Sequence, residues 1–89
     1  TLYPAYPNPF NPSVTINYSV ASAMDIQIKI FNLQGELITT LVNDYKPIGK
    51  YSSIWKGMDS NNHHVSSGVY FVRLTAGEFT QSQKIIFQK

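Results

Sequence analysis

The chain has 89 residues, enough for one domain with a single hydrophobic core and too few for two. Hydrophobic residues make up 43% of the chain and charged residues 13%, about half the charged share of an average protein. The net charge of +2 comes from dispersed basic residues, which argues against a nucleic-acid partner, and the absence of cysteine excludes disulfides, thiolate metal sites and cysteine nucleophiles.

The first 13 residues are rich in proline and predict an extended lead-in. Four prolines between Pro4 and Pro12 exclude a helix and remove backbone donors from any strand ladder. The aromatic residues among them are too apolar for a free linker, so we expect Phe10 to plug the end of the following domain, which spans residues 14–89. The alternative is a polyproline II ligand for an aromatic groove. Because the chain begins at Thr1 without methionine, we expect it to be a piece of a longer protein.

Three strands are predicted in the first half of the chain. Residues 14–20 and 25–30 alternate strictly between apolar and polar side chains, as half-buried strands do. Residues 32–35 read Asn-Leu-Gln-Gly, the pattern of a type I turn followed by a glycine bulge. Residues 36–42 contain apolar pairs at 37/38 and 41/42 that a helical turn would also explain, but the β-branched threonines favour a bulged strand.

Four further strands are predicted in the second half. Residues 43–49 form a loop that crosses between sheets, and residues 51–56 form a strand whose tryptophan, Trp55, anchors the core. A turn at 59–62 and a short strand at 63–65 precede the central strand at 67–74, in which Tyr70, Val72 and Leu74 share one face. A turn at Ala76-Gly77 leads to the closing strand, within residues 81–89. Seven strands predict an all-β, immunoglobulin-like antiparallel sandwich.

The residues that could carry chemistry are few. The five acidic residues flank turns, no two form a carboxylate pair, and neither a nucleophile elbow nor a phosphate-binding glycine loop is present. These observations predict a protein that is not an enzyme and holds no cofactor. His63 and His64 near Asp59 are the best metal candidates, but adjacent residues of a strand point to opposite faces, which favours a solvated turn.

Two other features could carry binding, and a third matches a modification pattern. Tyr45, Tyr51 and Trp55 could form a sugar-binding platform, although burial of Tyr51 and Trp55 in the core is the favoured interpretation. Residues 17–19 match the N-glycosylation pattern, yet a mid-strand position is a poor acceptor site. The closing strand could lie at a sheet edge and offer unpaired backbone groups to a partner.

Five segments in order carry a resemblance to a known family. They are YPNPFNPS (6–13), IKIFNLQG (28–35), WKGMD (55–59), SSGVYFVRL (66–74) and KIIFQK (84–89). This order and spacing resemble the type A C-terminal sorting domains of proteins exported by the type IX, or Por, secretion system of Bacteroidetes and related bacteria. The chain is also similar to the immunoglobulin-like domain of the flagellar hook-capping protein, which shares the proline-rich lead-in and the Trp-x-Gly-x-Asp segment.

The resemblance implies a non-catalytic address at the end of a larger secreted cargo. It implies recognition by an outer-membrane translocon and its β-barrel shuttle receptor, after transit through the periplasm to the cell surface or medium. The resemblance further implies that a cysteine-protease sortase then cuts upstream of the domain. By position, the sorting signal comprises Gly68, Tyr70, Lys84, Ile85, Ile86, Phe87, Gln88 and Lys89. The alternatives are a permanent structural module of the hook-cap kind and a carbohydrate-binding module of a hydrolase.

Overall fold

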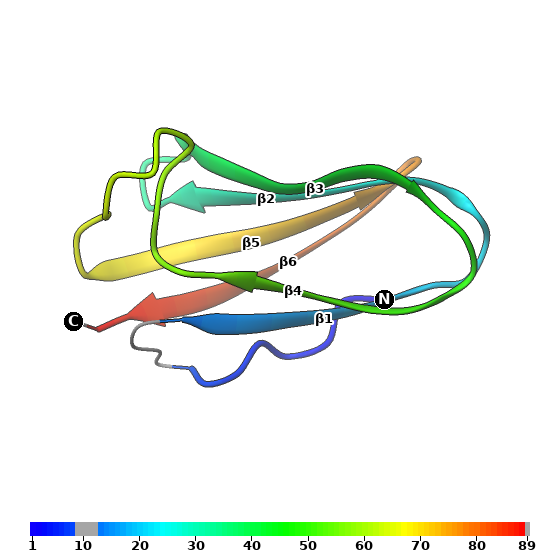
Figure 1. Cartoon of the computed structure of the whole chain (residues 1–89), viewed down its shortest axis with the longest axis horizontal. Helices are drawn as coiled ribbons and strands as arrows, with labels where there is room; N and C mark the ends of the chain where they lie inside the picture. Colours follow the sequence, from blue (N-terminus) through cyan, green and yellow to red (C-terminus); the bar gives the residue numbers. More distant parts are fainter. Residues whose placement is uncertain (9–12, 89) are drawn as a thin grey trace.

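The computed structural model describes residues 1–8 and 13–88, and these ranges contain six strands and no helix. The strands are β1 (Val14–Val20), β2 (Met24–Asn32), β3 (Leu37–Lys46), β4 (Gly49–Trp55), β5 (Gly68–Ala76) and β6 (Phe79–Phe87). A two-stranded sheet, β1-β4, faces a four-stranded sheet of order β3-β2-β5-β6 (Figure 1). Every pair is antiparallel. The predicted all-β antiparallel sandwich is therefore confirmed. No helix in the described ranges could cross a membrane.

Strict alternation in the sequence places the core between the two sheets. Every second residue of β1 is buried, and β2 and β5 repeat the pattern. The inward side chains on these three strands are Val14, Ile16, Tyr18, Val20, Ile26, Ile28, Ile30, Tyr70, Val72 and Leu74. As predicted, β5 is a central strand, because it pairs with β2 on one side and β6 on the other.

Strand β3 carries the bulges that its apolar pairs predicted. Its register against β2 shifts twice, so that Leu41 and Ile38 are the extra residues on the bulged strand. Each bulge resets the alternation, which lets Ile38, Leu41 and Val42 all pack against the core. The strand also continues to Lys46 by pairing with the start of β2. The predicted loop at 43–49 is therefore wrong, since only residues 47–48 lie between strands.

The turns follow their side-chain chemistry. Asn32 Oδ1 accepts hydrogen bonds from the backbone N–H groups of Gln34 (3.0 Å) and Glu36 (2.9 Å), and Gly35 adopts a φ of 85°. The predicted glycine-bulge turn is therefore confirmed. The predicted strand at 63–65 is reduced to one bridge between Met58 and His64, so six strands stand where seven were expected.

Residues 1–8 of the proline-rich lead-in lie beside β1 (Figure 1). Tyr3 N–H donates to the carbonyl of Asn17 at 3.0 Å, and Tyr6 and Thr15 exchange a pair of backbone hydrogen bonds. Leu2 and Ala5 are buried in the core. The lead-in therefore extends the small sheet by a short, irregular strand. Phe10, the expected plug, lies outside the described residues, and the domain boundary at 13/14 stays a prediction.

Candidate functional site

The β5–β6 hairpin brings the two predicted signal segments together. Gly68 lies opposite Phe87 in the register, and Tyr70 lies opposite Ile85. The hairpin closes through residues 77–78, one position later than the predicted turn, since Ala76 pairs with Phe79. Lys89 lies outside the described residues.

Three members of the predicted signal face the core. Tyr70, Ile85 and Phe87 are all 6% exposed or less. The Tyr70 hydroxyl donates a hydrogen bond of 2.7 Å to the carbonyl of Ser66. The tryptophan ring of Trp55 meets Tyr70 edge to face at 5.2 Å and lies 6.3 Å from Phe87. In the folded domain these side chains therefore hold the hairpin in place, and a partner would not touch them.

The other described residues of the predicted signal near the end of the chain are not part of the core. Lys84 and Gln88 are exposed and Ile86 is half-buried, as alternation along the strand predicted. Lys84 lies opposite Phe71 and Ile86 lies opposite Val69, on the outer face of the four-stranded sheet. These outward side chains are the part of the predicted signal that a partner could contact.

The free edge of β6 is covered by the lead-in. Asn8 Nδ2 donates to the Lys84 carbonyl at 3.2 Å, and Asn8 Oδ1 accepts from the Ile86 N–H at 3.0 Å. The Asn8 side chain thus replaces a neighbouring strand at these two backbone groups, which reduces the exposure of a sheet edge.

Two glutamines of β6 complete this contact. Gln81 exchanges hydrogen bonds with the backbone of Leu2, and Gln83 accepts from the Ala5 N–H and donates to the Tyr3 carbonyl, both at 2.7 Å. Sequence reasoning missed Asn8, Gln81 and Gln83. The sequence indicates such a contact only through the two glutamines at alternating positions, Gln81 and Gln83, before the apolar end of β6.

The Trp-x-Gly-x-Asp segment contacts the terminal strand directly. A Cβ placed on Gly57 would lie 2.8 Å from Phe87 Cζ, and Gly57 has a φ of 72°. Trp55 Nε1 donates to the Met58 carbonyl at 2.8 Å, which fixes the turn that presents Gly57. Close approach and backbone conformation both require glycine here. Gly57 and Phe87, which are 30 residues apart in the sequence and belong to different motifs, therefore pack directly against each other.

The predicted metal candidates form a turn. Asp59 Oδ1 accepts hydrogen bonds from the N–H groups of His63 (3.0 Å) and Asn61 (2.9 Å), and its Oδ2 lies 4.0 Å from His63 Nδ1. These donors, that of His63 foremost, hold the pKa of the Asp59 carboxyl below its usual value. Within residues 1–8 and 13–88 no group of three possible metal ligands occurs.

The three aromatic residues of the possible sugar platform are separated by their burial. Trp55 is 2% exposed and belongs to the core, as predicted, whereas Tyr45 is 64% exposed. Tyr51 is half-buried, stacks on Tyr18 at 5.5 Å and donates to the Pro47 carbonyl at 2.6 Å. Burial raises the pKa of the Tyr18 phenol, with smaller contributions from Tyr51 and Asp44. The three side chains do not form one exposed surface.

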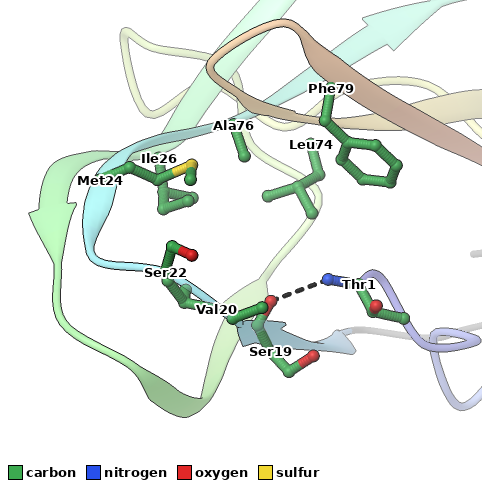
Figure 2. A pocket seen from close by; sticks show the side chains of 10 residues that line it. Thr1, Ser19, Val20, Ser22, Met24, Ile26, Leu74, Ala76 and Phe79 are labelled. Atoms are coloured by element: carbon green, nitrogen blue, oxygen red, sulfur yellow. Dashed lines mark hydrogen bonds between the residues drawn. The ribbon is translucent and has the colours of Figure 1, made fainter.

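A cavity of about 250 Å³ lies at the end of the sandwich where β1 ends and the β5–β6 turn begins (Figure 2). Gly68 and Phe87 lie at the other end of the β5–β6 hairpin. Its walls include Met24, Ile26, Leu74 and Phe79, and Thr1 lies at its rim, where its ammonium group donates to the Ser19 carbonyl at 2.8 Å. None of the predicted signal residues lines this cavity.

Comparison with known proteins identifies the family. The model of the secretion system C-terminal sorting domain matches residues 4–88, so the chain belongs to this family. No curated protein matches the chain. Two solved structures from Porphyromonas gingivalis share its fold. PorZ, an essential surface component of the type IX secretion system, has a TM-score of 0.66 at 21% identity, and dimeric latent PorU has a TM-score of 0.70 at 14% identity.

The chain matches only a small part of each of these two much larger proteins. They cover 99% and 97% of this chain, but only 11% of PorZ and 9% of PorU. The family is a sorting family, not a catalytic one. The protein is therefore a C-terminal sorting domain of type IX secretion, and it directs a covalently continuous cargo to the cell surface or the medium.

Proposed function

We propose that the outer-membrane translocon and its β-barrel shuttle receptor read the outward side of the terminal strand. Lys84, Ile86 and Gln88 make the contact in this proposal, together with Lys89, which follows them in the sequence and lies outside the described residues. The cargo passes through the periplasm to reach the receptor. The observation that supports the proposal is the division of β6, which presents Lys84 and Ile86 to solvent while Ile85 and Phe87 pack inward.

The remaining predicted signal residues act through the fold. Gly68 begins β5 opposite Phe87, and Tyr70 packs on Trp55, so both maintain the shape of the strand that is read. The domain performs no catalysis. A cysteine-protease sortase cuts the parent chain upstream of the domain after export, which mass spectrometry of the exported parent protein tests by showing whether the mature protein lacks residues 1–89.

The first prediction concerns the two lysines of the terminal segment. Changing Lys84 and Lys89 together to alanine should lower export of a fused reporter in a host with a working type IX system, because the receptor loses two basic contacts. Lys84→Ala alone should change the free energy of unfolding by no more than about 0.5 kcal/mol, as exposed substitutions usually do. Export is measured as the ratio of reporter outside the cell to reporter in the periplasm.

A matched control changes Lys50, on β4, and Lys56, directly after β4, to alanine; both lysines are exposed and neither belongs to the four-stranded sheet. The control has the same change in net charge and should export normally. Normal secretion of the folded Lys84/Lys89 variant would contradict the assignment of these lysines to the signal.

A further inference from the structure

A second surface of the domain lies on the outer face of the four-stranded sheet, away from the core. The outer face of the four-stranded sheet changes character along its length. Near the β5–β6 turn it carries the neutral polar side chains of Gln27, Thr75 and Thr80. Toward the opposite end it carries a basic-aromatic face, which we define as Lys29, Phe31, Phe71, Arg73 and Lys84.

The register places the members of the basic-aromatic face side by side. Lys29 lies directly opposite Arg73, Phe31 lies opposite Phe71, and Phe71 in turn lies opposite Lys84. Side chains directly opposite on antiparallel strands are about 4.5–5.5 Å apart at Cβ. Three cationic and two aromatic groups therefore occupy one continuous area across β2, β5 and β6.

In the part of the chain that the structure describes, the cations of this face have no ion-pair partner. Among the described residues, no carboxylate lies within 4.0 Å of Lys29, Arg73 or Lys84. The nearest acidic residue on the outer face of β2 is Asp25, four residues from Lys29 along the strand. Like charges directly opposite on neighbouring strands are destabilising, so the Lys29–Arg73 pair opposes folding. An acidic partner would remove this cost.

The geometry also prepares Arg73 for such a partner. Its guanidinium lies over the Phe31 ring, 4.2 Å from the ring centre. Stacking restricts the side chain and leaves the planar fork of N–H donors able to bind a carboxylate in a bidentate manner. A hollow of about 260 Å³ lies beside it, with Phe31, Phe71, Arg73 and Ser82 in its walls.

We propose that an acidic protein surface docks on the basic-aromatic face, with carboxylates on Arg73 and Lys29 and apolar side chains over Phe31 and Phe71. The inference rests on the proposed function, since this partner is the receptor that contacts Lys84, and it extends the contact from the terminal strand across to β2. The half-buried aromatic rings favour a protein over a phosphate-bearing lipid, because a headgroup phosphate would leave the rings uncovered. Aromatic residues and arginine are enriched at protein interfaces for the same reason.

The test changes the two cations that lie outside the predicted signal. Lys29→Gln with Arg73→Gln, in the domain fused to an exported reporter, leaves residues 84–89 intact. We expect export to fall roughly tenfold, the effect of losing about 1.4 kcal/mol of binding free energy. The matched control, Lys50→Gln with Lys56→Gln, removes the same charge outside the four-stranded sheet and should export as the unchanged domain does. Melting temperatures establish that both variants are folded.

The results separate this inference from the proposed function. If the unchanged domain does not export the reporter, the proposed function fails. If the Lys84/Lys89 variant fails to export but the Lys29/Arg73 variant and its control export equally well, the inference is overturned and the proposed function stands. An equal loss of export in the Lys29/Arg73 variant and the Lys50/Lys56 control would also overturn the inference, because it would indicate an effect of net charge.

A direct measurement addresses the chemistry of the partner. A carbodiimide, which joins amines to carboxylates in contact, is applied to the fusion protein bound to outer-membrane particles. We expect amide links from Lys29 or Lys84 to aspartate or glutamate of a type IX outer-membrane component, and their loss when Arg73→Gln weakens docking. Binding of the fusion protein to vesicles of phosphatidylglycerol, abolished by the Lys29/Arg73 change, would overturn the proposal in favour of lipid phosphate.

Discussion

Gly57 shows how one residue constrains the packing around the terminal strand. It lies directly against the ring of Phe87 on β6, while its neighbour Trp55 packs on both Phe87 and Tyr70. The position tolerates no side chain, because the space that a Cβ would need is occupied by the phenyl ring. Because Gly57 has no side chain, the segment that follows β4 can lie this close to the terminal strand.

Gly57→Ala should destabilise the domain by roughly 2–4 kcal/mol, which combines the cost of a positive φ for alanine with that of overpacking. Gly35→Ala is the matched control, since Gly35 has a φ of 85° but no atom within 4 Å of the Cβ position. It should cost about 1–2 kcal/mol from backbone strain alone. Chemical denaturation of both variants measures the difference. Equal losses would show that the Gly57–Phe87 approach does not matter.

Asp59 makes the stability of its turn depend on pH. Because its pKa is lower in the folded state, its carboxylate stabilises the fold fully above the ordinary aspartate pKa of about 3.9, and this contribution disappears as the pH falls through the folded-state pKa. Asp59→Asn keeps a side-chain acceptor but does not titrate. We expect the melting temperature of the unchanged protein to fall relative to that of Asp59→Asn between pH 5 and pH 2.5. A constant difference across this range would contradict the lowered pKa.

At the scale of the elements, the lead-in is held by side chains rather than by a complete ladder. Its backbone pairs with β1 at a few positions, and β6 contributes Gln81 and Gln83 from the opposite sheet. These glutamines place polar groups at the margin of an apolar core, where their hydrogen bonds satisfy backbone groups that no strand reaches. The lead-in therefore connects the edges of both sheets.

Gln83→Ala should loosen the lead-in without unfolding the sandwich. It removes two hydrogen bonds, each contributing about 0.5–1.5 kcal/mol, so the Ala5 amide should exchange with solvent at least fivefold faster. Ser82→Ala, at an exposed neighbouring position, is the control and should leave this rate unchanged. Unchanged exchange at Ala5 in Gln83→Ala would show that the hydrogen bonds of Gln83 do not hold this part of the lead-in.

Local patterns predicted the strands well and their ends poorly. Alternation defined β1 and β2, and the Asn32 turn followed from its side-chain chemistry, because both depend on near neighbours. The polar residues Asn43 and Asp44 looked like a loop, but β2 begins early enough to pair with them. The strand expected at 63–65 gave way to the Asp59 turn, which uses the His63 N–H.

At the scale of the whole molecule, contacts between the chain ends were beyond sequence reasoning. The hairpin that joins Gly68 and Tyr70 to Lys84 and Phe87 was predictable, since its strands are adjacent in sequence. The contact between Asn8 and β6 joins positions 76 and 78 residues apart and leaves no periodic trace. The basic-aromatic face was equally hidden, because it needs the register of three strands.

The direction of the lead-in has a mechanical consequence. Successive residues of the lead-in bond to successive residues of β6: Leu2 to Gln81, Ala5 to Gln83, and Asn8 to Lys84 and Ile86. The two segments therefore run parallel. Thr1 and the end of β6 lie toward opposite ends of the long axis (Figure 1). Tension between a cargo ahead of Thr1 and an anchor at the end of β6 would therefore load these hydrogen bonds in shear, all at once. If the two segments were instead pulled apart from one end, the same hydrogen bonds would break one at a time, at a lower force.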